Sequence, residues 1–109
     1  MTAKDVYLKL KKHFVENGYV ILSEHEYGMS ARRTGKEFEF SQMMDGDYLE
    51  AVLSLVSDEL LAVYDIIDET YSIDIFVKNP ENNGLAEVWK KKLQDEAALL
   101  EIEKLDLKF

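Results

Sequence analysis

The chain contains no cysteine, and this absence excludes several kinds of chemistry together. Without a thiol the chain can form no disulfide, no thiolate metal site and no covalent intermediate on sulfur. A cysteine-free chain fits a reducing compartment, so we expect the protein in the cytoplasm. Residues 1–5 lead directly into a charged amphipathic stretch and lack the apolar core of a secretory signal, which supports the same expectation.

Long hydrophobic runs and excess positive charge are also lacking. The apolar run from Leu60 to Tyr64 is much shorter than the roughly 20 residues needed to span a bilayer, so no transmembrane segment is predicted. The 13 basic side chains are outnumbered by 22 acidic ones, which gives a net charge of −9. Such a field repels nucleic acids and anionic lipids, and we expect the chain to bind neither. Acidity keeps a protein soluble, attracts a basic partner, or mimics a phosphate backbone.

Familiar catalytic and ligand-binding motifs are missing too. The sequence has no Gly-rich phosphate loop, no Gly-x-Ser-x-Gly turn and no His-Glu-x-x-His helix. With two histidines and no cysteine, a zinc site is not expected. Asp45-Gly46-Asp47 lacks the remaining ligands of a calcium loop, so we interpret it as a turn. No cofactor is predicted.

What is present favours one folded domain over residues 1–109. The hydrophobic fraction of 47% and charged fraction of 32% are typical of a globular protein, and 109 residues can bury one core. Apolar residues at spacings of three and four predict a helix over 3–17, which Gly18 ends. A second helix is predicted after residue 84, beyond the loop that contains Pro80, and its apolar face comprises Leu85, Val88, Trp89, Leu93, Ala97 and Leu100.

Alternation of apolar and polar residues between these helices predicts an antiparallel meander. Turns at 34–35, 45–46, 58–59 and 69–70 bring every apolar set to one side of the sheet. The aligned sets are Tyr27, Met29 and Ala31; Phe38, Phe40 and Gln42; Leu49, Ala51 and Leu53; Ala62, Tyr64 and Ile66; and Ile73, Ile75 and Val77.

The expected fold is therefore α+β: a two-layer sandwich with about five strands and both helices on one face of the sheet. Residues 19–23 and the tail with Leu105, Leu107 and Phe109 could add edge strands. A rival interpretation takes 47–68 as one long helix, because helix-forming residues dominate there and Asp47 could cap it.

On the opposite face, the same register aligns Glu39, Val52, Asp65 and Asp74 in one row. It places Asp65 directly opposite Asp74, and such like-charge pairs cost up to about 1 kcal/mol. Screening of the two negative charges by solvent is the simpler explanation for such a pair. Alternatively, Glu39, Asp65 and Asp74 could ligate Mg²⁺ or Ca²⁺, or divide into a general acid and a general base. This alternative predicts a small metal-dependent hydrolase.

Three basic residues surround the predicted turn at residues 34–35 and form what we call the basic group. Arg32, Arg33 and Lys36 lie close together in an otherwise acidic chain, and arginine suits bidentate contact with carboxylate or phosphate. They are candidates for contact with a partner. The alternative is a cross-strand ion pair between Arg32 and Glu37, which would contribute at most about 1 kcal/mol.

Apolar residues accompany the acidic row on this outer face. Contiguous exposed apolar area marks protein interfaces, although scattered exposed valines are also common on ordinary surfaces. We interpret the chain as a small acidic, non-catalytic protein-binding module that self-associates or binds a basic partner. The candidate contact residues are Val63 and Phe76, in addition to the basic group. The outer apolar residues are Val52, Val56, Leu61, Val63, Ile67 and Phe76.

Overall fold

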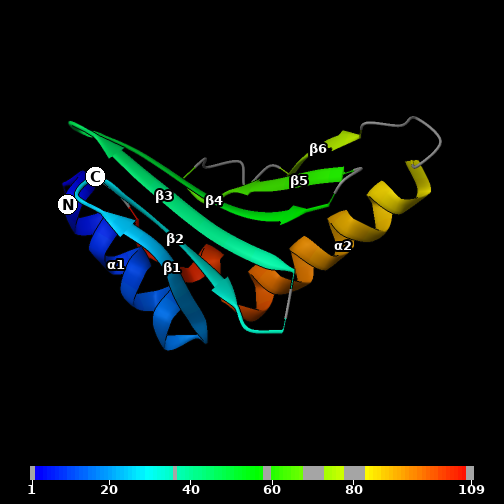
Figure 1. The fold of residues 1–109 in the computed structure, drawn as a ribbon, viewed down its shortest axis with the longest axis horizontal. Helices are drawn as coiled ribbons and strands as arrows, with labels where there is room; N and C mark the ends of the chain where they lie inside the picture. Colours follow the sequence, from blue (N-terminus) through cyan, green and yellow to red (C-terminus); the bar gives the residue numbers. More distant parts are fainter. Residues whose placement is uncertain (1, 36, 58–59, 68–72, 78–82, 108–109) are drawn as a thin grey trace.

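A computed structural model describes residues 2–35, 37–57, 60–67, 73–77 and 83–107, with the backbone alone at residues 74, 76, 77 and 83. Its strands form a six-stranded antiparallel sheet in which each strand pairs with its neighbours in the chain (Figure 1). This confirms the α+β meander. The elements are α1 (Ala3–Glu16), β1 (Tyr19–His25), β2 (Gly28–Arg33), β3 (Phe38–Asp45), β4 (Tyr48–Val56), β5 (Leu60–Asp65), β6 (Ile73–Val77), α2 (Asn83–Leu99) and the short 3-10 helix η2 (Ile102–Lys104).

Helix α1 begins and ends where its capping residues dictate. The Thr2 hydroxyl accepts a hydrogen bond from the Asp5 backbone N–H at 3.2 Å, and the Asp5 carboxylate accepts one from the Thr2 N–H at 2.9 Å. This capping box satisfies backbone donors that the first turn leaves without partners. After the helix, Gly18 adopts a φ of 92°, a left-handed conformation that glycine takes without strain. The predicted helix over 3–17 is confirmed to within one residue.

Alternation along the strands separates buried from solvent-facing side chains as predicted. On β3 and β4 the buried residues include Phe38, Phe40, Leu53 and Leu55, while their neighbours in sequence are more exposed. Strands β4 and β5 occupy the segment of the rival 47–68 helix, so that interpretation was wrong. The suggested edge strand over 19–23 is confirmed as part of β1. Tyr27 is an exception to the predicted face, because it is exposed.

The strand register agrees with the prediction at one hairpin and differs by two residues at the others. Leu53 lies opposite Tyr64, as predicted, in the β4–β5 pair. In the β2–β3 and β3–β4 pairs, Phe40 lies opposite Ala31 and Leu53 rather than Met29 and Ala51. A shift of two residues keeps every side chain on its face, because side chains alternate with a period of two. The prediction of which residues face the core was therefore correct even where the predicted register was wrong.

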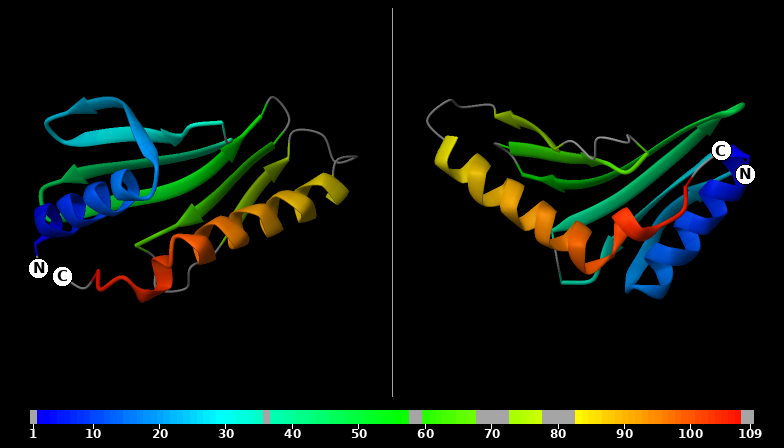
Figure 2. Two further views of the ribbon diagram at one scale, coloured as in Figure 1. Left: turned by 90° about the horizontal axis from the view of Figure 1, so that it is seen from below. Right: turned by 180° about the vertical axis from the view of Figure 1, so that it is seen from behind.

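Both helices pack on the same face of the sheet and close the core there (Figure 2). At its centre the Phe14 ring of α1 stacks on Phe40, with ring centroids 3.8 Å apart. The Tyr19 ring meets Phe14 edge-on at 4.9 Å, a favourable aromatic geometry. These contacts join α1 to β1 and β3.

The C-terminal tail packs beside the helices instead of adding a strand. Ile102 is fully buried, and Leu105 and Leu107 pack against the core. Its described part, through residue 107, contains η2 and no strand, so the edge strand suggested for the tail was wrong over those residues. Lys9 Nζ of α1 donates a 2.7 Å hydrogen bond to the Asp106 carbonyl and holds the tail in place. Both described chain ends therefore lie near α1.

Helix α2 is rotated relative to the predicted face. Leu85 and Val88 were predicted to face the core, but both are exposed. The charged residue Glu96 is instead only 5% exposed, because it takes part in a buried ion pair described below. The residues of α2 and its C-terminal end that enter the core are Ala86, Trp89, Leu93, Ala97 and Leu100.

Among the helices of the described ranges, none combines the length and the apolar character that crossing a bilayer requires.

Candidate functional site

The face of the sheet opposite the helices is the candidate functional surface, and we call it the outer face. In the described part of the chain, α1 and α2 both cover the other face (Figure 2). The outer face thus presents the side chains that point away from the core. A sheet with one covered and one open face is stable in the antiparallel arrangement, so the open face is free to carry function.

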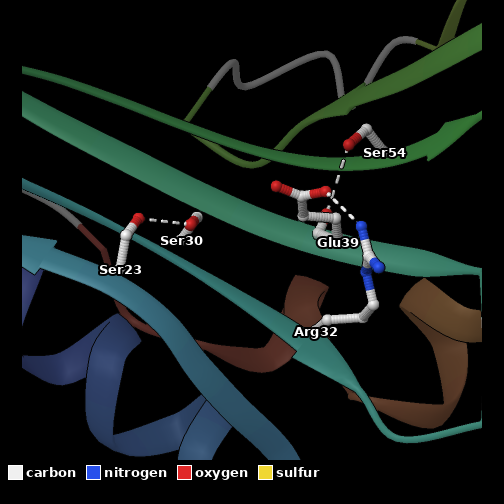
Figure 3. A network of polar contacts seen from close by, with 5 residues as sticks. All are labelled: Ser23, Ser30, Arg32, Glu39 and Ser54. Atoms are coloured by element: carbon white, nitrogen blue, oxygen red, sulfur yellow. Dashed lines mark hydrogen bonds and ion pairs between the residues drawn. The ribbon is translucent and has the colours of Figure 1, made fainter.

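Small polar residues occupy the centre of the outer face. The Ser23 and Ser30 hydroxyls are 2.7 Å apart across β1 and β2, and the Ser54 hydroxyl donates to the Glu39 carbonyl at 3.3 Å (Figure 3). Ser41 lies opposite Ser30 on the next strand. These short side chains border a hollow of about 290 Å³, whose wall includes Ser23, His25, Ser30, Ser41, Met43, Glu50 and Val52.

Apolar residues gather toward the end of the outer face where β4 passes into β5. Val56 lies opposite Leu61, and their exposed fractions are 58% and 36%. Val63, a predicted contact residue, is half-buried two positions further along β5. Phe76, the other predicted contact residue, lies opposite Leu61 in the register, but its side chain is outside the described residues. Ile67 instead packs against the core.

Charge is distributed unevenly between the sheet and the helices. Residues 37–77, which include β3 to β6, contain eleven aspartates and glutamates and no lysine or arginine. Seven lysines lie in the two helices, and α1 and α2 form the opposite layer. The negative charge of the protein therefore belongs to residues 37–77. On the outer face it includes Glu39, Glu50 and Asp65, and the backbone register adds position 74.

The predicted basic group is divided between the two faces. Adjacent residues in a strand point to opposite sides, so Arg32 and Arg33 separate. Arg32 lies on the outer face and pairs with Glu39 at 3.3 Å (Figure 3), not with Glu37 as predicted. Glu37 instead approaches Lys92 of α2 at 4.0 Å. Lys36 lies outside the described residues.

Arg33 points inward and forms a buried ion pair with α2. Its guanidinium lies 3.0 Å from Glu96, whose side chain is 3% exposed, and 5.2 Å from the centre of the Tyr19 ring. Burial, and next the Glu96 charge, raise the pKa of the Tyr19 hydroxyl, while Arg33 acts in the opposite direction. This cluster joins β1, β2 and α2. Arg33 is therefore engaged within the fold.

The three carboxylates of the predicted metal site do not form one row. Asp65 lies opposite Val52, as predicted, but Glu39 lies opposite Ser54 and Asp74 opposite Val63. The predicted direct opposition of Asp65 and Asp74 was wrong. Within the described ranges, no group of three or more metal-ligating side chains lies together. Because the Asp74 side chain is outside the described residues, the three-carboxylate site stays a prediction.

A larger hollow of about 670 Å³ lies on the helix side of the sheet. It is bounded by Tyr64 and Ile73 on the strands and by residues of α2 and η2. Lys104, at its edge, already pairs with Glu101 at 3.2 Å. Residues 68–72, between the strands that bound it, are not described. We assign this hollow no function.

Sequence reasoning missed the serine-lined hollow and the buried Arg33–Glu96 pair. The hollow had a signal, because Ser23, Ser30 and Ser41 all fall at outward positions of neighbouring strands once the register is known. The ion pair had none, because Arg33 and Glu96 are far apart in sequence and belong to different elements.

Comparisons of the chain with protein-family models, with curated proteins and with solved structures give no match. Inference about function therefore depends on the geometry of the outer face.

Proposed function

We propose that this chain is a non-catalytic protein-interaction module whose outer sheet face binds a partner surface that is basic and partly apolar. The observation that carries the proposal is the combination found on this face: exposed apolar residues within a segment whose charges are all acidic. We further propose that residues 1–109 act as one domain in the cytoplasm, which the absence of cysteine supports.

The apolar residues supply the area that such binding requires. Val56 and Leu61 are neighbours across β4 and β5, and Val63 continues the patch along the strand. Removing apolar surface from water contributes about 25 cal/mol per Å², so a few side chains of this size provide useful affinity. Single exposed valines are common on any surface, but apolar side chains paired across strands form a continuous area.

The acidic charges supply selectivity. Glu50 lies on the outer face and is exposed, and Asp65 lies in the next row, beside Val52. Residues 37–77 carry only acidic charges, and such a region attracts oppositely charged surfaces, speeds their association and repels acidic ones. Nucleic acids and anionic membranes carry the wrong sign, so a basic protein segment is the partner that fits this charge.

A titration followed by amide NMR tests the proposal. The probe is a twelve-residue peptide of alternating lysine and leucine, and the matched control peptide carries glutamate in place of lysine. We expect the basic peptide to shift amide signals mainly in β3 to β5, including Val52 and Val63, with affinity that falls as salt is added. The acidic peptide should leave these signals unchanged.

Two variants locate the binding surface in the same titration. Leu61→Ser removes apolar area from the outer face and should weaken binding of the basic peptide by about fivefold, which corresponds to about 1 kcal/mol. Val88→Ser makes a similar change on exposed α2 and should have no effect. Equal losses in both variants, or signals that shift mainly in the helices, would contradict the proposal.

A further inference from the structure

Strand β1 is an open edge of the sheet. It pairs with β2 on one side, and no strand of the described ranges pairs with its other side (Figure 1). Open edges present unpaired backbone donors and acceptors, and proteins commonly protect them with charged residues or proline. The first half of β1, residues 19–22, contains neither, and its apolar residues Val20 and Leu22 are each 55% exposed. This edge is therefore equipped to receive another strand.

Helix α1 adds exposed apolar residues on the helix side of this edge. Leu8, Lys11 and Val15 lie three and four residues apart, so they share one face of the helix. Lys11 forms an ion pair with Glu24 of β1, which shows that this face is turned toward the edge strand. Leu8 and Val15 are 49% and 44% exposed. Val20 of β1 lies opposite Arg32 and therefore points to the outer face, whereas α1 lies on the helix side of the sheet. Exposed apolar side chains thus lie on both sides of the open edge.

The charges near this edge permit approach by an identical chain. Residues 2–25 contain four lysines, at positions 4, 9, 11 and 12, against three carboxylates, at positions 5, 16 and 24. The region is close to neutral, although the whole chain has a net charge of −9. The opposite edge, β6, belongs to the segment without basic residues, and two such edges repel each other. Charge therefore favours self-association at β1 and disfavours it at β6.

We propose that a second copy of this chain docks on the β1 edge, with the two β1 strands antiparallel about a twofold axis. An isologous contact of this kind joins the same surface on both copies, so Leu8 and Val15 of one α1 approach their counterparts. The β-bulge between Ile21 and Ser23 limits the paired length, because an extra residue interrupts the ladder. The acidic β6 edges remain outside, which closes the assembly as a dimer.

This dimer leaves the outer faces of both copies open and does not depend on what they bind. If both proposals hold, one dimer presents two acidic faces, and a partner with two basic segments binds more tightly through effective concentration. A titration in which the basic peptide fails to bind would count against the proposed function and not against the dimer. A protein that is monomeric would count against the dimer and not against the proposed function.

Sedimentation equilibrium with edge variants tests the dimer. We expect the purified chain to sediment with twice its monomer mass. Val15→Lys and Leu22→Lys should each raise the dimer dissociation constant by at least about tenfold, because lysines meet across the twofold axis and apolar contact is lost. Val88→Lys, on exposed α2, is the matched control and should leave the dissociation constant unchanged.

Hydrogen exchange supplies an independent measurement that does not require a variant. Amides of β1 should exchange more slowly as protein concentration rises through the dissociation constant, while those of β6 should not change. A chain that remains monomeric at millimolar concentration overturns the proposal. So does a dimer that Leu61→Lys dissociates and the two edge variants do not, because the second copy then occupies the outer face.

Discussion

Replacing Arg33 with methionine is expected to lower the free energy of unfolding by about 3–5 kcal/mol, because the buried Glu96 carboxylate then loses its guanidinium partner. Methionine retains much of the length of the arginine side chain, so the loss reports the missing charge more than missing volume. The effect extends across the fold, since Arg33 connects β2 with α2 and lies against the Tyr19 ring. Urea denaturation followed by circular dichroism measures it.

Two further variants separate the ion pair from general damage to the hairpin. Arg32→Met changes the adjacent residue, whose ion pair with Glu39 is exposed, and should cost less than about 1 kcal/mol. The double variant Arg33→Met with Glu96→Leu removes both charges of the pair and should regain most of the lost stability. Similar losses for the two single arginine variants would show that the structure assigns the buried pair wrongly.

Replacing Phe40 with alanine should also destabilise the protein by about 3–5 kcal/mol, through lost apolar burial and the cavity left behind. Phe40 is fully buried and stacks on Phe14, so the cavity would open between β3 and α1. The same urea measurement applies. Loss of this stack should also weaken the docking of α1, the helix that carries Phe14.

The control for Phe40 is the next residue along the same strand. Ser41→Ala changes an outward side chain and should alter the free energy of unfolding by no more than about 0.5 kcal/mol. A large loss at Ser41, or a small one at Phe40, would show that the faces of β3 are reversed. The pair therefore tests which side of the sheet is dry.

The faces of the sheet could be predicted from sequence because alternation is a local property. Phe38, Phe40 and Leu53 identify the dry side without knowledge of their partners. The exact pairing could not be predicted, because it depends on which residues form each turn. At Asp45-Gly46-Asp47 we expected glycine at the second central position, but Gly46 occupies the first, where its φ of 60° suits a type II′ turn. This change moves the register by two residues.

The helices were predicted with unequal success for a similar reason. Helix α1 has one apolar stripe and clear caps, so its ends and its buried face followed from spacing alone. Helix α2 has apolar residues over a wide arc, and the sequence does not show which part of the arc is covered. The rotation of α2 about its axis depends on Glu96, which is buried and pairs with Arg33, whereas Val88 is exposed to solvent. Pairings between distant residues are not visible in local periodicity.

The candidate site shows the same limit. Val63 was correctly placed on the outer face, whereas Arg32 and Arg33 were grouped although alternation puts them on opposite faces. The predicted carboxylate row does not form because the β3–β4 and β5–β6 pairings are each shifted by two residues. A two-residue error does not affect which face a side chain occupies, but it changes every neighbour. Predictions about faces are therefore stronger than predictions about contacts between particular residues.

Cysteine scanning of β4 tests most directly whether one face of this sheet is open to partners. Because the chain has no cysteine of its own, a single substitution gives an unambiguous thiol signal. We expect Val52→Cys and Ser54→Cys to react with a thiol reagent in the folded protein, and Ala51→Cys and Leu53→Cys to react only on unfolding. Protection of all four thiols, or reactivity that recurs every three to four residues, would contradict an open sheet face.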